Sequence, residues 1–429
     1  MTMRKIRNFY HWFLALLGSC WYGRPSRKIF VLGVTGTKGK STVLELTNAI
    51  LEAGGKKTAL LSSIRRKVGR KTEENLTGNT MPGRFQIQRF LDEAVRAGAE
   101  FALIEVTSEG VLQHRHEFTD WDAAIMTNLA PEHIEHHGSF ENYRAAKLKF
   151  FQYLAFSKKT KKYFFINEED GSHHYFEEAA RRTPNREIIL YSRHDLVNHE
   201  VGRRYKLNSK AGRRLLGDWL LADFNLENAA AAVAFARTQN IDWPIIEKAL
   251  TNFRGAPGRL EFVQKEPFAV VVDYAHTPDS LKQVYETLEP KSFKPRSRGK
   301  MICVLGSAGG GRDKWKRPEI GKIAATYCDK IVLTNEDPYD ENPNEIIRQI
   351  ENGFLEATVP KCGPEDHFRV LDRRAALKHA VSLAKKGDVV VITGKGSEAW
   401  LHLARGEKIP WNERKMAEEI LRNASQPMI

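Results

Sequence analysis

The sequence contains no apolar run long enough to cross a lipid bilayer, and it has few cysteines. A membrane-spanning helix needs about 20 consecutive apolar residues, and no segment of the 429 residues approaches that length. The four cysteines, Cys20, Cys303, Cys328 and Cys362, lie far apart and form no C-x-x-C pair. Their spacing argues against a disulfide framework and a cysteine zinc site, and it fits the reducing cytosol. We therefore expect a cytoplasmic protein.

No signature of a DNA- or RNA-binding module is present, although the chain is basic. It has 67 Lys and Arg against 53 Asp and Glu, which gives a net charge of +14. The 41% hydrophobic and 28% charged residues are typical of a globular protein of two or three domains. We expect a monomer without a nucleic-acid partner. Its positive charge indicates either a solvated basic surface or attraction for a phosphorylated, carboxylated substrate.

Acidic residues are absent from residues 1–28, which carry six basic ones. Apolar side chains recur there with the period of one helix face: Phe9, Trp12, Phe13, Leu16 and Leu17. The segment lacks the cleavage pattern of a signal peptide. Two interpretations remain open, a helix docked on the next domain and an interfacial helix that contacts anionic lipid peripherally.

From residue 29 onward, apolar strands alternate with helices, which predicts a mostly parallel sheet. The predicted strands of the first series are Ile29–Val34, Ala59–Ser62, Phe101–Val106, Ala123–Thr127, Tyr163–Ile166 and Ile188–Leu190, and a helix is predicted over Lys40–Ala53. A second series comprises Phe268–Val272, Met301–Leu305, Ile331–Leu333 and Val389–Ile392. We expect an α/β protein with a central P-loop-type domain over 29–255 and a Rossmann-like domain over 256–429.

A glycine-rich segment follows the first predicted strand and carries the strongest functional signal. It reads Gly33-Val34-Thr35-Gly36-Thr37-Lys38-Gly39-Lys40-Ser41-Thr42. Glycines let backbone N–H groups face a phosphate, and the N-terminus of the next helix adds positive potential. Lys40 would reach the terminal phosphates of a nucleotide, and Ser41 or Thr42 would contact Mg²⁺. Val34 breaks the strict Walker spacing, but the compact form G-T-x-G-K-S is complete.

Two further groups of polar residues follow later strands. Glu105 lies at the carboxyl end of a predicted strand, where ligands of parallel sheets collect, and a carboxylate there suits Mg²⁺. Asn128, His133, Tyr143 and Lys147 come after the next strand. The histidines near residue 133 resemble a zinc site at first, but no helical i, i+4 pair and no cysteine supports zinc. We therefore expect His133 to face the same cleft as Lys40 and Glu105.

These residues, in this order, resemble the central domain of the Mur ligases, the ATP-dependent amide-forming enzymes of cell-wall precursor synthesis. Further segments that are similar to the family are Asp223-Phe224-Asn225-Leu226-Glu227-Asn228, Pro257-Gly258-Arg259-Leu260-Glu261 and Asp273-Tyr274-Ala275-His276-Thr277-Pro278. The UDP-N-acetylmuramoyl-tripeptide synthetase branch is resembled by Asn79-Thr80-Met81-Pro82, by Gly306 to Pro318 and by Gly394-Lys395-Gly396-Ser397-Glu398.

The resemblance implies a set of site residues, with ATP and two Mg²⁺ ions as cofactors. The residues implied to bind ATP are Gly36, Thr37, Lys38, Gly39, Lys40, Ser41, Thr42, Asn128, Asn225, Asn228, Arg259 and Asp273. The implied metal residues are Ser41, Thr42, Glu105, His133 and Lys147, with Lys147 carboxylated on its amine by CO₂; Lys40, Glu105, His133 and Lys147 are the implied catalytic residues. The implied substrate contacts are Thr80, Arg115, Arg312, Lys316, Asp337 and Glu398.

Several positions depart from the pattern of the family. The diaminopimelate enzymes of this branch carry D-N-P-R, where this chain has Glu336-Asp337-Pro338-Tyr339. A phenol cannot replace a bidentate arginine, so lysine or another amine remains open. Ser397 and Glu109 each stand where the family has histidine. Because only about 28 residues precede the first strand, we also expect the uridine-nucleotide-binding domain to be missing.

Three hypotheses follow from the sequence. The first is a ligase that adds the third amino acid to a UDP-N-acetylmuramoyl dipeptide through an acyl phosphate, in peptidoglycan synthesis. The second is a similar ligase with another acceptor: folylpolyglutamate, cyanophycin, poly-γ-glutamate or a lipid-linked muropeptide. The third is an ATP-binding subunit that has lost ligation. The intact set of Lys40, Glu105, His133 and Lys147 favours the two enzymes.

Overall fold

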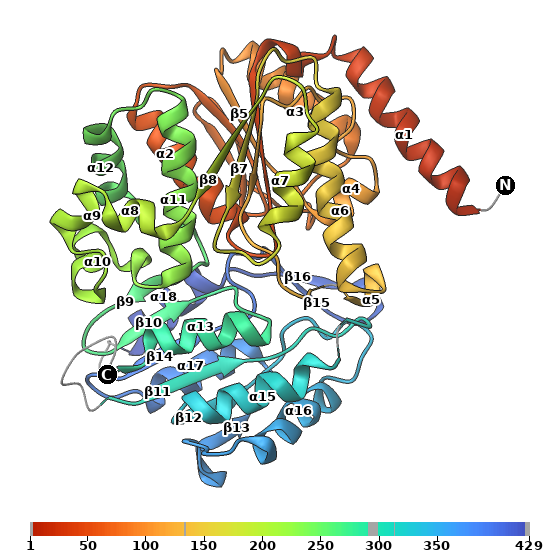
Figure 1. Ribbon diagram of the computed structural model, residues 1–429. Coiled ribbons are helices and arrows are strands. Elements are labelled where there is room, and N and C mark those ends of the chain that lie inside the picture. The colour runs from red at the N-terminus through yellow and green to blue at the C-terminus, as the bar shows by residue number, and fades with distance from the viewer. Residues whose placement is uncertain (1–2, 133, 291–298, 313, 425–429) are drawn as a thin grey trace. The chain divides into compact units, whose positions relative to one another are not determined.

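A computed structural model describes residues 3–132, 134–290, 299–312 and 314–424 (Figure 1). The chain divides into two compact units, residues 1–254 and 255–429. The sequence analysis predicted the boundary between the two domains one residue later, between residues 255 and 256.

The first unit is built on an eight-stranded sheet with the order β4-β3-β2-β5-β1-β6-β7-β8. Its strands are β1 (Phe30–Thr35), β2 (Thr58–Leu61), β3 (Arg65–Val68), β4 (Lys71–Glu74), β5 (Phe101–Glu105), β6 (Ala123–Met126), β7 (Lys162–Asn167) and β8 (Arg186–Tyr191). β1, β2, β5, β6, β7 and β8 run parallel, whereas β3 and β4 pair antiparallel at one edge. The predicted α/β fold with a mostly parallel sheet is confirmed.

Helices cover both faces of this sheet (Figure 1). The α-helices of the unit are α1 (Met3–Trp21), α2 (Lys40–Ala53), α3 (Arg84–Arg96), α4 (Ser108–Leu112), α5 (Ile134–His137), α6 (Phe140–Tyr153), α7 (His173–Arg181), α8 (Arg193–Asn198), α9 (Glu200–Tyr205), α10 (Lys210–Leu216), α11 (Asp223–Thr238) and α12 (Trp243–Asn252). Leu32 and Val34 of β1 pack with α2, α11 and α12, while Val31 packs with α3, α6 and α7. The strand is therefore buried on both faces, which explains its unbroken apolar sequence.

Helix α1 docks on the first unit, as one of the two interpretations of residues 1–28 expected. The rings of Trp12 and Phe118 lie 5.3 Å apart, and those of Tyr22 and Phe85 lie 5.4 Å apart. The hydroxyl of Ser19 donates to the carbonyl of Phe118 at 3.1 Å. Within the described part of the chain, α1 and the other helices are too short or too polar to span a bilayer.

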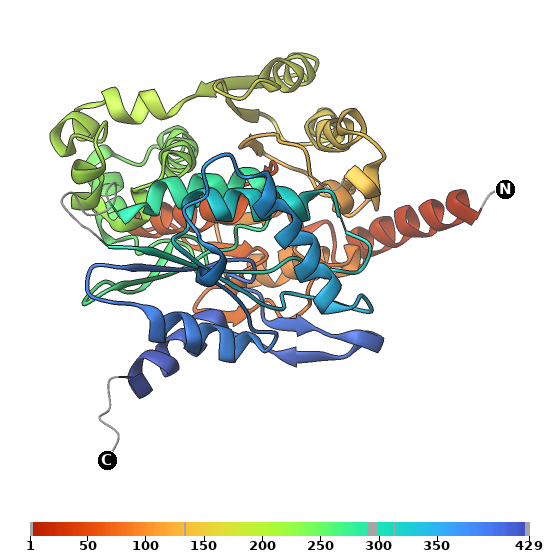
Figure 2. The same cartoon turned by 90° about the horizontal axis from the view of Figure 1, so that it is seen from below.

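The second unit has a six-stranded sheet with the order β13-β12-β11-β14-β10-β9, in which only β9 is antiparallel to its neighbour. The strands are β9 (Glu261–Gln264), β10 (Ala269–Val272), β11 (Met301–Leu305), β12 (Lys330–Leu333), β13 (His367–Arg369) and β14 (Val389–Ile392), with a separate hairpin of β15 (Trp400–His402) and β16 (Lys408–Pro410). Helices α13 (Pro278–Leu288), α15 (Lys316–Tyr327) and α16 (Pro343–Asn352) cover one face, and α17 (Arg373–Leu383) and α18 (Glu413–Ala424) the other (Figure 2).

The cysteine spacing led to a wrong expectation for one pair. Cys303 in β11 and Cys328 directly after α15 form a disulfide, with their Cα atoms 6.0 Å apart. β11 pairs in parallel with β12, so the α15 crossover brings the chain back to the end of the sheet at which both strands begin. The crossover brings together two residues that are 25 positions apart in the sequence. Cys20 and Cys362 are free cysteines.

Candidate functional site

The loop between β1 and α2 contains two glycines at positions where any side chain would collide with neighbouring atoms. Gly36 has φ +148°, and a Cβ there would lie 1.9 Å from Thr127 Oγ1. Gly39 has φ +81°, and its Cβ would lie 2.1 Å from Asn228 Oδ1. Only glycine adopts these conformations at such close approach. The predicted phosphate-binding loop is therefore tightly packed against β6 and α11.

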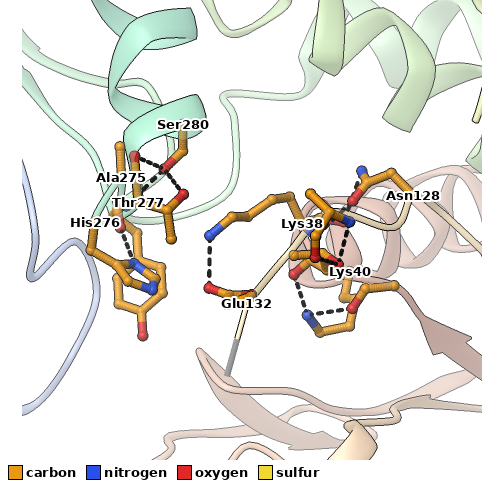
Figure 3. Close-up of polar contacts among 12 residues, drawn as sticks. Lys38, Lys40, Asn128, Glu132, Ala275, His276, Thr277 and Ser280 are labelled. Atoms are coloured by element: carbon orange, nitrogen blue, oxygen red, sulfur yellow. Dashed lines mark hydrogen bonds and ion pairs between the residues drawn. The ribbon is translucent and has the colours of Figure 1, made fainter. Parts of the chain in front are cut away.

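Asn128 holds the centre of this loop. Its side-chain oxygen accepts from Lys38 N at 2.9 Å, and its backbone carbonyl accepts from Thr37 N at 2.8 Å (Figure 3). The Thr37 hydroxyl in turn lies 3.1 Å from the hydroxyl of Tyr143. Asn128, which the resemblance implied to bind ATP, and Tyr143 thus fix the shape of the loop.

The two lysines of the loop point in different directions. Lys40 Nζ donates to the carbonyls of Thr37 at 2.8 Å and Gly36 at 3.1 Å (Figure 3). Lys38 Nζ forms an ion pair with Glu132 at 2.9 Å. Lys40 therefore lies along the inside of the loop, where its ammonium can meet the phosphates of a nucleotide.

Ser41 and Glu105 meet at the carboxyl ends of β1 and β5. Glu105 is paired in register with Val34 of β1, and its Oε2 accepts from the Ser41 hydroxyl at 3.0 Å. The same oxygen accepts from Ser63 N at 2.9 Å, and the two serine hydroxyls lie 3.0 Å apart. The arrangement is a set of hard oxygen atoms beside the start of α2, which is the donor type that Mg²⁺ prefers. Sequence reasoning missed Ser63, although it follows a strand next to that of Glu105.

Lys147 of α6 is completely buried beneath the loop. Its Nζ donates to the carbonyl of Gly36 at 2.6 Å and lies 4.7 Å from the centre of the Tyr143 ring. Burial, followed by repulsion from Lys40, lowers the pKa of Lys147 well below its ordinary value. A lowered pKa favours a neutral, nucleophilic amine at this position.

The histidine predicted as a metal ligand, His133, lies outside the described residues. Of its neighbours, His137 Nε2 lies 3.2 Å from the hydroxyl of Ser108. Over the described ranges, no cluster of three or more His, Cys, Asp or Glu side chains has the geometry of a metal site.

Asn225 and Asn228, expected near adenine, lie in the first turns of α11. Asn228 Nδ2 donates to Asn225 Oδ1 at 3.1 Å, and Asn225 Nδ2 donates to the carbonyl of Trp219 at 2.5 Å. Both side chains are buried. They connect the start of α11 to the loop at Gly39. Thr42, in the first turn of α2, is buried as well.

The predicted substrate residues of the first unit lie next to each other in the fold. Arg115 Nη1 donates to the carbonyl of Met81, directly after Thr80, and Nη2 donates to Gln113 Oε1 at 2.7 Å. Burial lowers the pKa of Arg115 below its ordinary value. The guanidinium therefore anchors the loop that carries Thr80.

A buried ion network lies in the second unit, around Lys395. Its Nζ contacts both carboxylate oxygens of Asp337 at 2.8 Å and Glu398 Oε2 at 2.5 Å. The hydroxyl of Tyr274 donates to Glu398 Oε1 at 2.8 Å. Burial opposes the charge of Glu398, but Lys395 and Tyr274 hold the pKa of this carboxyl below its usual range. The side chains of Asp337 and Glu398, both predicted to contact substrate, are therefore held together by one lysine.

An aromatic and cationic group adjoins this network. Arg312 Nη2 donates to the hydroxyl of Tyr339 at 3.1 Å, and the Tyr339 ring stacks on His402 with the ring centres 5.1 Å apart. The backbone N–H of His402 donates to Asp337 at 2.9 Å. Tyr339, at the position where the resemblance to the diaminopimelate enzymes implied an arginine, therefore lies beside the guanidinium of Arg312. No sequence motif indicated His402, which lies in the β15–β16 hairpin.

The remaining predicted residues of the second unit are Asp273, Arg259 and Lys316. The carboxylate oxygens of Asp273 accept from Leu260 N at 2.6 Å and Ala275 N at 2.7 Å. The Arg259 guanidinium lies over the ring of Tyr274 at 4.1 Å. Lys316 is buried at the start of α15.

The turn after Tyr274 leads into α13. His276 Nδ1 lies 2.8 Å from the carbonyl of Tyr274, and a capping box of Thr277 and Ser280 begins the helix (Figure 3).

Comparison with known families places both units. Residues 34–236 match the Mur ligase middle domain, and residues 258–396 match the Mur ligase, glutamate ligase domain. The UDP-N-acetylmuramoyl-L-alanyl-D-glutamate–2,6-diaminopimelate ligase of Syntrophomonas wolfei is 37% identical over 415 residues, which cover 95% of this chain and 81% of that protein. The UDP-N-acetylmuramyl-tripeptide synthetase of Roseiflexus sp. is 33% identical over 423 residues, with 95% and 81% covered.

Solved structures have the same fold. A UDP-N-acetylmuramoyl-L-alanyl-D-glutamate–2,6-diaminopimelate ligase matches with a TM-score of 0.59 and 25% identity, covering 96% of this chain and 83% of that one. A folylpolyglutamate synthase of Mycobacterium tuberculosis matches with a TM-score of 0.66 and 15% identity, covering 89% and 91%. At 15% identity the second likeness concerns the fold alone.

Proposed function

We propose that this chain, which belongs to the Mur ligase family and is an ATP-dependent, ADP-forming ligase, adds an amino acid to UDP-N-acetylmuramoyl-L-alanyl-D-glutamate. The observation that carries this proposal is the 37% identity to a ligase of that name over 95% of the chain. The product would be a peptidoglycan precursor. Because its nucleotide substrates are cytoplasmic metabolites, we propose that the enzyme acts there, as a monomer.

The proposed reaction has two steps. An oxygen of the substrate carboxylate attacks the γ-phosphorus of ATP, the bond from this phosphorus to the bridging oxygen of ADP breaks, and an acyl phosphate forms. The amine of the incoming amino acid then attacks the acyl carbon, inorganic phosphate leaves, and the amine loses a proton. The first step brings anions together, so positive charge and positioning carry it. Lys40 and the loop of Gly36 and Gly39 would supply both.

Enzymes of this family use Mg²⁺, and the oxygen atoms beside the loop fit that ion. Ser41 and Glu105 bring a hydroxyl and a carboxylate within 3.0 Å, and Ser63 adds a second hydroxyl. Mg²⁺ commonly keeps several waters and takes only one or two protein ligands besides phosphates. We propose that Ser41 and Glu105 hold one ion, with Thr42 close by, and that His133 serves a second. The ion would supply charge neutralisation at the phosphates.

We further propose that Lys147 becomes carboxylated. Its buried amine has a strongly lowered pKa, and only the neutral amine can attack CO₂. The nitrogen forms a bond to the carbon of CO₂ and releases one proton, which leaves a carbamate. The resulting anion would sit beneath Gly36 and orient the second metal position. An unmodified ammonium would instead bind phosphate directly.

The second unit would receive the amine. The carboxyl groups of Glu398 and Asp337 are held side by side by Lys395, and we propose that they bind the incoming ammonium group and accept the proton that the nucleophile loses. Arg312 and Lys316 would contact carboxylates of the substrates. Other contacts that we propose are Thr80 and Arg115 for the acceptor, and Lys38, Thr37, Asn128, Asn225, Asn228, Arg259 and Asp273 for ATP.

The identity of the amine depends on the surroundings of Tyr339. The relatives include diaminopimelate ligases, whereas this chain carries a phenol where that group has its arginine. Arg312 donates to this phenol, so a cation still lies within one hydrogen bond of position 339. We propose an amino acid with a free α-amine as the substrate, and the choice among lysine, diaminopimelate, ornithine and glutamate is tested by phosphate release.

Phosphate release tests the proposal. The purified chain is incubated with ATP and Mg²⁺, with a UDP-muramoyl dipeptide or a folate as acceptor, and with lysine, diaminopimelate, ornithine or glutamate as amine. We expect release only with the muramoyl dipeptide and one of the amines. Release with folate and glutamate alone would contradict the acceptor, and ATP binding without release in every mixture would indicate a binding subunit.

A further inference from the structure

Helix α1 has two different apolar faces: one is buried against the protein, and the other is largely exposed, although the Trp21 ring on it also lies 6.5 Å from that of Phe85. Ala15, Gly18 and Ser19 are buried on the docked face, where a Cβ at Gly18 would lie 3.2 Å from the ring of Phe85. The opposite face carries Tyr10, Phe13, Leu17 and Trp21 at spacings of three and four residues, which place them on one stripe. Their side chains are exposed.

The exposure of this stripe is large for residues of this type. Tyr10 is 57% exposed, Leu17 is 42% exposed and Trp21 is 73% exposed. Single exposed apolar residues are normal on a protein surface, but a contiguous row of aromatic and aliphatic side chains marks an interaction site. The stripe of Tyr10, Phe13, Leu17 and Trp21 is called the outer stripe below.

We propose that the outer stripe docks α1 on the surface of an anionic lipid bilayer. Residues 1–28 contain six basic residues and no acidic one. Among them, Arg24 and Lys28 have exposed side chains directly after the helix, while Arg27 is exposed but pairs with Asp120 at 2.9 Å. Trp and Tyr rings favour the boundary between headgroups and acyl chains, and cationic side chains favour anionic headgroups. Because no described helix qualifies as a membrane span, α1 would lie in the plane of the interface.

Charge also argues against a second copy of the chain as the occupant. Two copies meeting at this helix would bring together two segments with six positive and no negative charges each. Four side chains on one helix also cover much less than the roughly 1,200 Å² that a stable protein interface buries. An anionic bilayer satisfies the charge and accepts a narrow apolar stripe.

Vesicle sedimentation with the full chain tests the proposal. The vesicles are phosphatidylcholine alone, or phosphatidylcholine with phosphatidylglycerol. The wild-type chain should bind the anionic vesicles in preference to the neutral ones, and added salt should weaken binding. The variant Tyr10→Ser/Leu17→Ser/Trp21→Ser should bind at least about tenfold more weakly. Phosphate release in solution should be unchanged, because these residues lie outside the proposed ligase site.

A matched control removes the same number of exposed apolar side chains elsewhere. Leu215, Leu355 and Val359 are all strongly exposed, and none belongs to α1. The variant Leu215→Ser/Leu355→Ser/Val359→Ser should bind vesicles as the wild-type chain does. Equal loss in both variants would show that binding is not located at α1 and would overturn the proposal, as would no binding to anionic vesicles.

A milder variant keeps the test independent of folding. Lipids brominated on their acyl chains should quench the tryptophan fluorescence of the wild-type chain, and Trp21→Phe should remove a part of that quenching. Unchanged quenching in Trp21→Phe would contradict insertion of the outer stripe. A dimer in solution that the triple variant of α1 abolishes, without vesicle binding, would identify a protein interface instead.

Discussion

Replacement of the buried Lys147 by methionine separates a catalytic amine from a structural one. Methionine has a similar length but no charge. The Gly36 carbonyl would lose the donor at 2.6 Å yet keep Lys40 Nζ at 3.1 Å. One lost hydrogen bond is worth about 1 kcal/mol, and removal of a buried amine relieves its desolvation. We therefore expect the free energy of unfolding of the first unit to change by no more than about 1 kcal/mol at neutral pH.

Ligation should respond much more strongly. The loss of one preorganised electrostatic group at a reacting phosphate typically costs about 10²–10³-fold in rate, and we expect Lys147→Met to lose at least that much phosphate release. Lys149→Met is the control, because Lys149 lies on the same helix and is exposed. Stability can be followed by hydrogen exchange in α6. Normal ligation by Lys147→Met would refute the proposed catalytic role of Lys147. A loss of several kcal/mol of stability would show that the lysine is needed mainly for the fold.

The pH dependence supplies a second readout of the same variant. The pKa of Lys147 is lowered in the folded protein, so the unfolded state binds more protons between this folded-state pKa and about 10.5. The wild-type chain should therefore gain stability relative to Lys147→Met as pH rises through that window. A stability difference between the wild-type chain and Lys147→Met that does not change with pH would contradict a buried, neutral amine.

Three further predictions concern other residues. Lys395→Met should destabilise the second unit by about 3–5 kcal/mol, since it leaves buried carboxylates unpaired, and hydrogen exchange in β14 measures the loss; full protection would contradict the network. Burial raises the pKa of Asp122 from 3.8 to about 6 although Lys159 opposes it. As pH rises from 4 to 6, the wild-type chain should therefore lose stability relative to Asp122→Asn, by at most about 3 kcal/mol in urea unfolding. A gain in stability relative to the variant over this range would contradict the burial of Asp122. Tyr339→Arg should increase kcat/KM for diaminopimelate relative to lysine by about tenfold or more, and an unchanged ratio would exclude position 339 from amine selection.

The sequence predicted those parts of the fold that depend on local apolar pattern. The helix over Lys40–Ala53 and the strand Met301–Leu305 have the predicted bounds, because a glycine lies at or near each end of both elements. Strands β3 and β4 were missed, since their residues, Arg65–Val68 and Lys71–Glu74, are mostly charged; they pair antiparallel, and β4 is the exposed edge strand. Such edges pair through their backbones and need no apolar run.

Contacts across the fold were beyond the reach of sequence patterns. The disulfide of Cys303 and Cys328 forms because the α15 crossover brings the chain back to the end of the sheet at which β11 and β12 begin. Ser63 reaches Glu105 only because β2 lies beside β5. In the same way, the hairpin that carries His402 meets Tyr339 through tertiary packing. Motifs predicted the positions of the glycine loop and of Glu105, but the partners of each side chain required coordinates.

The transfer of oxygen from the acceptor carboxylate to phosphate tests the proposed chemistry most directly. The muramoyl dipeptide is labelled with ¹⁸O in the carboxylate that becomes the amide, and the phosphate released during ligation is analysed by mass spectrometry. An acyl phosphate leaves one of these oxygens on the phosphate when the amine displaces it, so we predict one ¹⁸O atom for each phosphate formed. Unlabelled phosphate, together with normal formation of the amide, would contradict activation of the carboxyl group by ATP.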